Sequence, residues 1–297
     1  MNPKNYILRS LLFVPGNNEK LMKSASRTEA DALILDLEDS VLESEKTIAR
    51  EIIKEKVESG SFDNFQVFIR LNDIESGLLE EELESLAING ITGFILPKSQ
   101  NGQDVFFIED LLNRIEIEKG FPSGKFTIIP LIETTEAVLS IRKTCSSSKR
   151  IIAVCFGSED FLNDLRGTHD ENNIALLVPR ANIALAARAS GIIPIDTLHT
   201  DVHDLDDLEK NLKVSKTLGF EGMLLLHPKE IQLAHKYYTP SNEEYESAKE
   251  MLRLSEQANK QKKKVAIING RFIGPPMIKT AKRIIKRFEM IKVARDK

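Results

Sequence analysis

The chain has 297 residues with a formal net charge of −4, and 41% of its residues are hydrophobic and 29% charged. This balance is typical of a soluble globular protein with room for one large domain and an extension. The start, Met1 to Ser10, is polar and no apolar run approaches the roughly 18 residues of a membrane span, so we expect a cytoplasmic protein with no membrane partner. Cys145 and Cys155 are too few for a disulfide framework or a thiolate metal site, and Cys155 lies in an apolar run that favours burial.

Eight short apolar runs recur along the chain, and polar stretches with helical spacing lie between them. This alternation predicts a (β/α)8 TIM barrel. An open doubly wound sheet is the alternative, but it would usually carry a glycine-rich phosphate loop, and neither GxGxxG nor a Walker A loop occurs. The predicted strands are Leu11–Gly16, Ala32–Glu38, Gln66–Asn72, Gly93–Lys98, Phe126–Glu133, Ile151–Asp160, Ile192–Thr197 and Met223–Pro228.

The barrel is expected to span residues 1–238, and a helical lid or oligomerisation extension is expected over residues 239–297. A last helix in this extension has an apolar stripe that must pack on something. The stripe is formed by Met277, Ala281, Ile284, Phe288 and Ile291. The other predicted elements are the eighth barrel helix from Pro228–Ile231, a helix from about Glu243, a basic linker at Lys262–Lys264, a strand at Val265–Ile268 and a turn at Asn269–Gly270.

Charge is distributed unevenly between these two parts. Residues 259–297 contain 13 basic and 2 acidic side chains, whereas residues 1–258 contain 28 basic and 43 acidic ones. The simplest interpretation of the basic segment is a solvated face. Otherwise its partner is the acidic part of the chain, another subunit or a phosphorylated ligand. No aromatic interleaving supports nucleic acid, so no nucleic-acid partner is expected.

Polar side chains stand at the carboxyl ends of the predicted strands, which a TIM barrel gathers around the mouth where ligands bind. Glu133 is the most informative, because an apolar strand ends on this carboxylate just before a helix that Thr134 or Thr135 can cap. Glu133 could instead merely favour the positive end of that helix. Because every strand but the first contributes an ionisable side chain, a shared site is the better interpretation. The rim residues are Pro15, Gly16, Asp36, Glu38, Asp39, Arg70, Asn72, Lys98, Glu133, Asp160, Asp196 and His227.

The residue types at this rim indicate its chemistry. Glu133 and Asp160 supply hard oxygen ligands, which suit Mg²⁺ with open positions for substrate oxygens rather than zinc. Arg70 offers a planar fork for a carboxylate or a developing enolate oxygen. Lys98 could form a Schiff base, but nearby acidic residues would keep its amine charged. A metal with an arginine serves reactions that make or break a carbon–carbon bond next to a carbonyl.

Two further groups allow a structural and a functional interpretation. His199 and His203 are four residues apart and could chelate a metal on a helix. They open the acidic stretch Asp201–Glu209, however, so we interpret them as part of a loop that enters a helix. Glu159, beside Asp160, could orient the waters of a metal or simply face solvent.

Short motifs accompany the strand ends: RSLLFVPG at 9–16, DALILDLED at 31–39, RLN at 70–72, LPK at 96–98, PLIE at 130–133, FGSED at 156–160, ALAARA at 184–189, and GFEG at 219–222 with HP at 227–228. In this order they resemble the citrate lyase beta-subunit-like proteins of the HpcH/HpaI aldolase superfamily, whose relatives include malyl-CoA and citramalyl-CoA lyases. The resemblance covers roughly residues 7–282.

The resemblance implies Mg²⁺ bound through Glu133 and Asp160, with Arg70 on the substrate's carbonyl or carboxylate. It implies CoA thioesters of hydroxy acids as substrates, cleaved to acetyl-CoA or a homologue and a 2-oxo acid, or formed by the reverse condensation. Family members are usually homotrimers or hexamers whose C-terminal segment covers a neighbouring active site, which would bring the basic segment near CoA phosphates. The expected substrate-binding residues are Gly16 and Lys20 on the CoA side, and Arg70, Asn72, Lys98 and Glu133.

One position departs from the family pattern. The lid of the CoA lyases carries a motif resembling Asp-Gly-Lys-Met-Ile-Asp-x-Pro, whose second Asp is the catalytic acid/base, whereas residues 269–276 are Asn-Gly-Arg-Phe-Ile-Gly-Pro-Pro. Gly274 therefore stands where the acid would be, and the loss of general acid/base catalysis is worth about 10²–10⁴-fold. Asp36, Glu38 and Glu159 are the candidate replacements.

The expected function is a Mg²⁺-dependent lyase or condensing enzyme acting on malyl-, citramalyl- or citryl-CoA, with Arg70, Glu38 and Asp36 as the catalytic residues. Two alternatives stay open. One is a thioesterase that hydrolyses the acyl-CoA without breaking a carbon–carbon bond. The other is a binding protein for a CoA thioester or oxo acid, with little catalysis because Gly274 replaces the lid acid.

Overall fold

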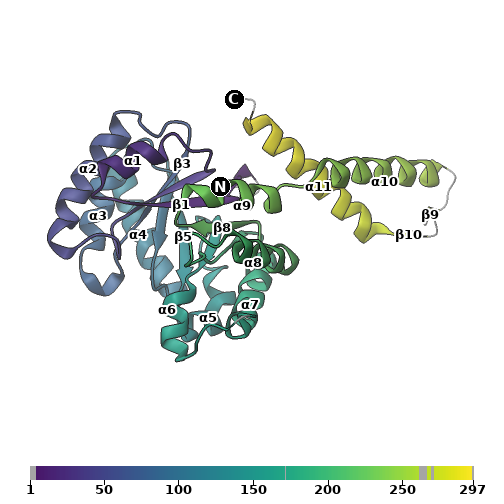
Figure 1. Ribbon diagram of the computed structural model, residues 1–297. Coiled ribbons are helices and arrows are strands. Elements are labelled where there is room, and N and C mark those ends of the chain that lie inside the picture. The colour runs from purple at the N-terminus through teal and green to yellow at the C-terminus, as the bar shows by residue number, and fades with distance from the viewer. Residues whose placement is uncertain (1–4, 171, 261–265, 269–270, 296–297) are drawn as a thin grey trace. The chain divides into compact units, whose positions relative to one another are not determined.

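Eight parallel strands form a closed barrel in which β8 pairs with β1 (Figure 1). The computed structural model describes residues 5–170, 172–260, 266–268 and 271–295. Each strand overlaps one of the predicted apolar runs, so the predicted (β/α)8 barrel is confirmed. The strands are β1 (Ser10–Pro15), β2 (Ala32–Asp36), β3 (Gln66–Arg70), β4 (Gly93–Leu96), β5 (Thr127–Ile132), β6 (Ala153–Phe156), β7 (Ile193–Asp196) and β8 (Gly222–Leu225).

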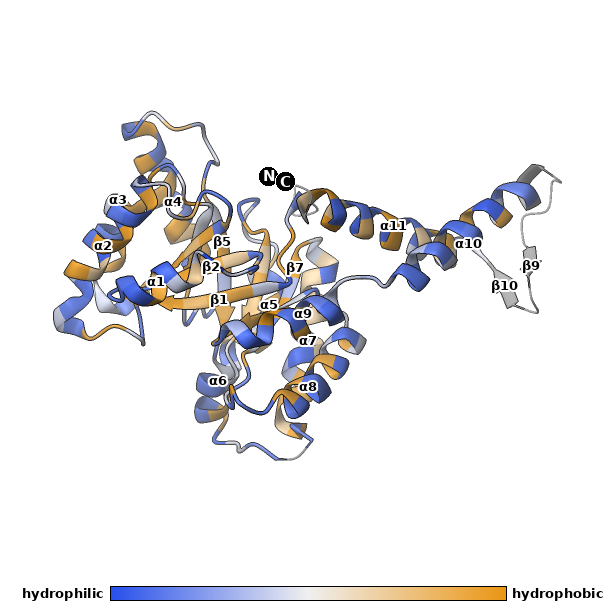
Figure 2. Cartoon of the chain, turned by 45° about the horizontal axis from the view of Figure 1, so that its top comes forward, coloured by the Kyte–Doolittle hydropathy of each residue, from blue (hydrophilic) through white to orange (hydrophobic). Residues whose placement is uncertain are grey.

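The strands are continuous apolar runs because the barrel interior and the surrounding helices cover both of their faces. Every residue of β2 and of β4 to β8 is buried, and Figure 2 colours the strands as almost entirely hydrophobic. Phe68, Ile129 and Leu224 belong to the core cluster, and the partly buried Phe13 and Leu198 pack against it. Cys155 is fully buried in the same cluster, as predicted.

The strand register sets up the site. Asp36 at the end of β2 pairs with Pro15 of β1 on one side and with Arg70 of β3 on the other. Ile132 of β5, the residue before Glu133, pairs with Phe156 of β6. The polar residues at these strand ends therefore lie at one end of the barrel.

Nine helices and three short 3₁₀ turns lie in the described connections between the barrel strands or directly after β8. The side chain of Thr134 accepts a hydrogen bond from Ala137 N–H and caps α5, as the sequence predicts. The strand predicted over Ile151–Asp160 is too long, because the chain enters a helix after Gly157 and Ser158–Asp160 form its first turn. The helices are α1 (Glu19–Ala25), α2 (Lys46–Glu58), α3 (Leu79–Leu86), α4 (Gly102–Glu118), α5 (Thr135–Thr144), α6 (Ser158–Leu165), α7 (Ile174–Ser190), α8 (Leu205–Leu218) and α9 (Ile231–Tyr238), and the turns are η2 (Glu43–Glu45), η3 (Ile74–Ser76) and η4 (Pro228–Glu230).

By compactness the chain divides into two units, Met1–His235 and Lys236–Lys297. The second unit contains α10 (Asn242–Lys260) and α11 (Pro275–Arg295), with an antiparallel pair of strands, β9 (Ala266–Ile268) and β10 (Arg271–Ile273).

The apolar stripe of α11 is packed, as predicted, and Phe288 in it contacts α10 of the same unit. Ala281 and Ile291 are buried, and the Phe288 ring stacks on Tyr245 of α10 with ring centroids 4.2 Å apart. The predicted linker Lys262–Lys264, the first residue of the predicted strand, Val265, and the predicted turn Asn269–Gly270 lie outside the described residues. No helix in the described ranges combines the length and the apolar character needed to cross a membrane.

Candidate functional site

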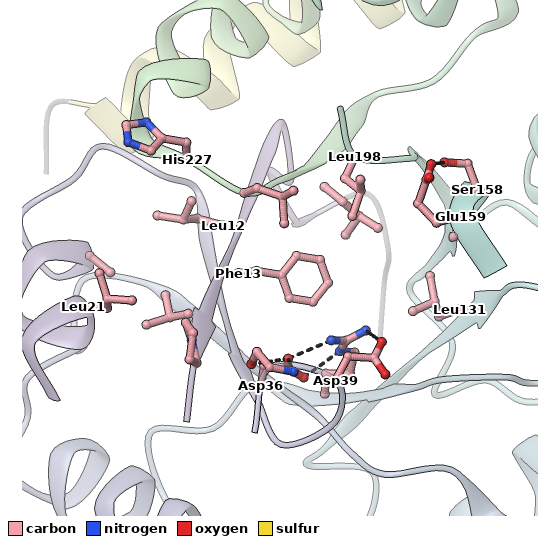
Figure 3. A pocket seen from close by; sticks show the side chains of 18 of the residues that line it. Leu12, Phe13, Leu21, Asp36, Asp39, Leu131, Ser158, Glu159, Leu198 and His227 are labelled. Carbon is pink, nitrogen blue, oxygen red and sulfur yellow. Dashed lines mark hydrogen bonds and ion pairs between the residues drawn. The ribbon is translucent and has the colours of Figure 1, made fainter. Parts of the chain in front are cut away.

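A cavity of about 820 Å³ opens at the carboxyl ends of the barrel strands. Seven of the twelve predicted rim residues line it together, among them Asp36, Arg70, Glu133 and Asp160. Figure 3 shows Asp36 and Asp39 at one end of the cavity, with the Phe13 ring between them and the leucines Leu12 and Leu198. The remaining lining residues are Leu12, Phe13, Val14, Pro15, Leu21, Ser24, Ala25, Asp39, Ser40, Leu131, Gly157, Ser158, Glu159, Leu198, Leu224, Leu226, His227 and Pro228.

Three carboxylates hold Arg70, and its guanidinium carbon lies 4.8 Å from the centroid of the Phe13 ring. Its Nε donates to Asp36 Oδ1 at 2.6 Å and its Nη2 to Asp36 Oδ2 at 2.7 Å, while its Nη1 lies 2.9 Å from Glu38 Oε2 and 3.3 Å from Asp39 Oδ2. Burial alone would lower the pKa of Arg70, but these contacts outweigh it and raise that pKa. Burial likewise opposes ionisation of Asp36, yet the Arg70 hydrogen bonds and charge lower its pKa overall. Arg70 and Asp36 therefore stay charged.

Glu38 touches Arg70 but does not line the cavity. Its buried oxygens lie 2.9 Å from Arg70 Nη1 and 3.0 Å from Lys98 Nζ, which are ion-pair distances, yet neither oxygen is in hydrogen-bond geometry with a partner. Burial raises the pKa of Glu38 to about 7, against the attraction of Arg70. Glu38 can therefore exchange a proton close to neutral pH.

Lys98 connects Glu38 with Glu133. Its backbone is left-handed, with φ of 49°, and in this conformation its N–H donates to Glu133 Oε2 at 2.6 Å. A lysine in this region is uncommon, and such backbone strain is concentrated at functional sites. Burial tends to lower the pKa of the Lys98 amine, but Glu38 and Asp73 outweigh it and raise that pKa. The amine stays charged, which argues against a Schiff base.

Glu133 directly follows β5 and is only 3% exposed. Burial, together with the negative charges of Glu38 and Asp160, raises the pKa of Glu133 to about 8, even though the Lys98 N–H opposes this shift. Gly157 makes room for the side chain, because a Cβ at that position would lie 2.6 Å from Glu133 Cγ. A buried carboxylate beside like charges is the kind of group that a cation stabilises.

Asp160 and Glu159 reach the cavity from the first turn of α6, and both are exposed. Within the described ranges, no group of three or more His, Cys, Asp or Glu side chains is arranged to hold a metal. The two predicted metal ligands, Glu133 and Asp160, line the same cavity and offer only carboxylate oxygens. Such a set suits Mg²⁺, which usually keeps several waters and takes one or two carboxylates from the protein.

Two predicted rim residues have their partners outside the cavity lining. Asn72 is 2% exposed, donates to the Leu37 carbonyl at 3.1 Å and also bonds Glu82 through its side chain and its N–H. Asp196 is fully buried and accepts from Arg180 Nε at 3.1 Å and from Arg180 Nη2. Both side chains are held by buried partners, which gives them a structural role.

Gly16 and Lys20, the predicted CoA-side residues, are also outside the cavity lining. Gly16 is buried, and its N–H donates to the Asp36 carbonyl at 2.8 Å. A Cβ at Gly16 would lie 2.5 Å from that carbonyl oxygen, so the close approach of the two strand ends needs a glycine. Lys20 is exposed on α1.

His199 and His203 lie in the loop before α8, as predicted, rather than on a helix.

Other side chains at the site are less evident in the sequence. Gly157 could have been found, because a glycine between a strand end and two acidic residues indicates a close approach. Phe13 and Leu198 line the cavity but are apolar residues in or beside apolar runs, so no sequence signal separates them from the core.

Several known proteins are similar to this chain in sequence and in fold. A family model described as HpcH/HpaI aldolase/citrate lyase matches residues 9–228. Citrate lyase subunit beta of Escherichia coli K12 is 31% identical over 282 residues, covering 95% of this chain and 93% of the relative. The mitochondrial citramalyl-CoA lyase of Rattus norvegicus is 27% identical over 301 residues, covering 98% and 89%. Protein CitE of Mycobacterium tuberculosis, in complex with magnesium and pyruvate, is 26% identical with a TM-score of 0.66, covering 79% of this chain and 93% of that one.

Proposed function

The chain belongs to the HpcH/HpaI aldolase/citrate lyase family as a citrate lyase beta-like carbon–carbon lyase, and from this premise we propose that it cleaves a 3-hydroxyacyl-CoA with Mg²⁺ into acetyl-CoA and a 2-oxo acid. The reverse condensation uses the same groups. The observation that carries the proposal is the convergence of Glu133, Asp160 and Arg70 on one cavity. In support, one relative is named a citramalyl-CoA lyase, and the M. tuberculosis structure holds magnesium and pyruvate.

Glu133 and Asp160 are the residues that would hold the cation. The fit rests on the chemistry of the donors: both are carboxylates that line the same cavity, and no described lysine, arginine or histidine forms an ion pair with the buried Glu133 carboxylate. When bound, the cation acts as a Lewis acid that draws negative charge onto the substrate oxygens.

Cleavage needs one proton removed and one returned. The hydroxyl group on the third carbon loses its proton, the bond between the second and third carbons breaks, and the electron pair passes to the thioester as an enolate that takes a proton on its second carbon. Arg70 supplies fixed positive charge for the developing enolate or oxo-acid oxygens. Two groups are candidates to take this proton and return it: Glu38, whose pKa is raised to about 7 but which lies behind Arg70 outside the cavity lining, and Glu159, which lines the cavity. Asp36 stays ionised and holds Arg70 in place.

The CoA side of the site is assigned to the turn after β1, where Gly16 shapes the backbone and Lys20 is exposed. The C-terminal unit would add to it as a lid from a neighbouring subunit. The side chains of Lys279, Lys282 and Lys286 on α11 are exposed and could meet the CoA phosphates.

Self-association as a homotrimer or hexamer is part of the same proposal. On α7 the large apolar side chains of Ile174, Val178 and Leu185 are 66%, 66% and 69% exposed and share one face of the helix. The only charged residue between positions 174 and 187 is Arg180, which is buried against Asp196. An exposed helix face without charge is typical of a subunit contact.

A product assay separates this function from its two alternatives. Purified protein with Mg²⁺ is offered malyl-, citramalyl- and citryl-CoA, and both acetyl-CoA and free CoA are followed. We expect acetyl-CoA and the matching 2-oxo acid. Free CoA with an intact hydroxy acid would identify a thioesterase, and binding without any product would identify a binding protein.

Gly274→Asp is expected to raise the rate of cleavage. The substitution places a carboxyl group where the CoA lyases that this chain resembles carry their lid acid. General acid/base catalysis contributes about 10²–10⁴-fold to the rate. The measurement is kcat for acetyl-CoA formation in the variant and the wild type, with Gly274→Asn as a control of similar size that carries no acid. An unchanged kcat in Gly274→Asp would mean that the chain's own groups already supply the proton transfer.

Cation affinity is expected to rise with pH up to about 8. Without a bound cation, the pKa of Glu133 is raised to about 8, so Mg²⁺ must displace a proton at lower pH. The folding stability of the chain without a cation changes with pH in the opposite direction. The stabilisation that comes with the raised pKa of Glu133 is complete at low pH and is lost as pH rises through 8. Calorimetric titration with Mg²⁺ at pH 6.5 and 8.5, in buffers of different ionisation enthalpy, measures affinity and proton release. Equal affinity and no proton release at either pH would contradict the assignment.

Gly157→Ala is expected to weaken Mg²⁺ binding by about 10–100-fold, the usual effect of disturbing the support of a metal ligand. The new Cβ would lie 2.6 Å from Glu133 Cγ and must push this side chain aside. Gly167→Ala is a matched control, because its Cβ would meet only leucine side chains, the nearest atom being 3.2 Å away. Calorimetric Kd values for both variants check the prediction, and equal values would show that Glu133 does not depend on this space.

A further inference from the structure

The cavity has an apolar floor beside its metal-ligand candidates. Phe13 and Leu198 line the cavity and also pack against the core cluster of the barrel, which includes the cavity-lining Leu131 and Leu224. Figure 3 shows the Phe13 ring in the middle of the cavity, with Leu198 and Leu131 on one side of it. The floor is therefore the top of the barrel core, and Glu133 follows Leu131 by two residues.

The polar part of the cavity is rich in negative charge and has little free positive charge. Five carboxylate residues line it: Asp36, Asp39, Glu133, Glu159 and Asp160. Among the described lining residues Arg70 is the single lysine or arginine, and its Nε, Nη1 and Nη2 already contact Asp36, Glu38 or Asp39. A bound divalent cation and Arg70 can serve one carboxylate and one carbonyl or hydroxyl of a substrate, but a second carboxylate would find no further lysine or arginine among the described lining residues.

The three candidate substrates differ in the group that their third carbon carries. The third carbon carries a hydrogen in malyl-CoA, a methyl group in citramalyl-CoA and a carboxymethyl group in citryl-CoA. A methyl group gains free energy on an apolar surface, whereas an unpaired carboxylate there loses its hydration.

We propose that this site selects 3-hydroxyacyl-CoA substrates whose third carbon carries a small apolar group, and rejects those that carry a second carboxylate there. Leu198 and Phe13 are the specificity-determining residues, because they form the floor on which this group lies. The inference rests on the proposed lyase function and narrows its substrate class.

The first test compares kcat/KM for the three CoA thioesters with Mg²⁺. We expect citramalyl-CoA to exceed malyl-CoA by about 10-fold, the usual effect of one methyl group, and to exceed citryl-CoA by at least about 100-fold. Cleavage of citryl-CoA as fast as citramalyl-CoA would overturn the inference and leave the lyase function standing. Absence of cleavage for all three would overturn the lyase function.

The second test measures binding without turnover. In the presence of Mg²⁺, pyruvate, the oxo acid with a methyl group, is expected to bind at least about 10-fold more tightly than oxaloacetate, which carries the second carboxylate. Calorimetry on the wild-type protein gives both Kd values even where no thioester is cleaved. Tighter binding of oxaloacetate would overturn the inference.

Leu198→Arg tests the floor directly by adding a cation to it. We expect the ratio of kcat/KM for citramalyl-CoA to that for citryl-CoA to fall by at least about 10-fold. The preference for pyruvate over oxaloacetate, measured as the ratio of their Kd values, should fall by the same factor. Leu165→Arg is the matched control, since this leucine of α6 is 43% exposed and is outside the cavity lining. An unchanged preference in a folded Leu198→Arg protein would show that this residue does not set specificity.

Discussion

Glu133→Gln is expected to remove Mg²⁺-dependent cleavage, with a fall in kcat/KM of at least about 10³-fold, because it takes away a proposed metal ligand and leaves the side-chain volume nearly unchanged. Glu133 is 3% exposed, and its pKa is raised to about 8 by burial and by the charges of Glu38 and Asp160. Glutamine keeps an oxygen that can accept from the Lys98 N–H but carries no charge for the cation.

Stability gives this variant a second readout with an opposite sign. In the wild-type chain without bound cation, the raised pKa of Glu133 means that stability falls as pH rises from about 4.5 through 8. Glu133→Gln should reduce this dependence to the part that comes from Glu38, whose pKa is raised to about 7, and should abolish the rise in Tm that Mg²⁺ causes. Glu136→Gln, an exposed position in the first turn of α5, is the control that should behave as the wild type. Chelator-sensitive activity in Glu133→Gln would show that another residue holds the cation.

Arg70→Ala is expected to cost both activity and about 3–5 kcal/mol of folding free energy. Arg70 is 9% exposed, and its guanidinium is the countercharge of Asp36 and Glu38, which are 1% and 6% exposed. Removal of one member of a buried ion pair leaves its partners charged and unpaired, which is strongly destabilising. Urea denaturation measures the loss.

Arg70→Lys separates folding from catalysis. Lysine restores a positive charge beside the buried carboxylates but not the planar fork that binds Asp36 through two nitrogens. We expect a smaller loss of stability than in Arg70→Ala, with kcat/KM still reduced by about 10²-fold or more. Arg114→Ala, which breaks an exposed pair with Glu80, is the control and should change neither quantity. Wild-type activity in Arg70→Lys would show that catalysis does not depend on the planar group of Arg70.

The fold was predictable because its strands are covered on both faces and so stand out as uninterrupted apolar runs. The strand ends were less certain. Ser158–Asp160 begin α6 and do not extend β6, since acidic residues favour a helix amino terminus as readily as they follow a strand. The resemblance of the motifs to the HpcH/HpaI superfamily is confirmed by the family model over residues 9–228.

The candidate site was predictable only where residue type is informative. Asp36, Arg70, Glu133 and Asp160 are charged, lie at or shortly after strand ends and line one cavity. Asn72 and Asp196 look the same in the sequence, and nothing local reveals their buried partners Glu82 and Arg180, which lie 10 and 16 residues away. The left-handed backbone of Lys98 has no sequence signal at all, because glycine is the usual residue there.

The apolar floor shows a third limit. Phe13 and Leu198 have the same residue types as the core beneath them, and only the three-dimensional arrangement shows that they face the cavity as well. Substrate preference depends on such residues, so it could not be inferred from the charged motifs alone.

The most direct test of the account is the position of a bound divalent cation. Crystals of the wild-type protein and of Glu133→Gln, grown with Mn²⁺ as a substitute for Mg²⁺, would be compared by anomalous scattering. We expect one strong peak coordinated by Glu133 and Asp160 in the wild type and none there in the variant. A peak held by other residues, or a peak that survives in Glu133→Gln, would contradict the assignment of these two carboxylates as the metal site.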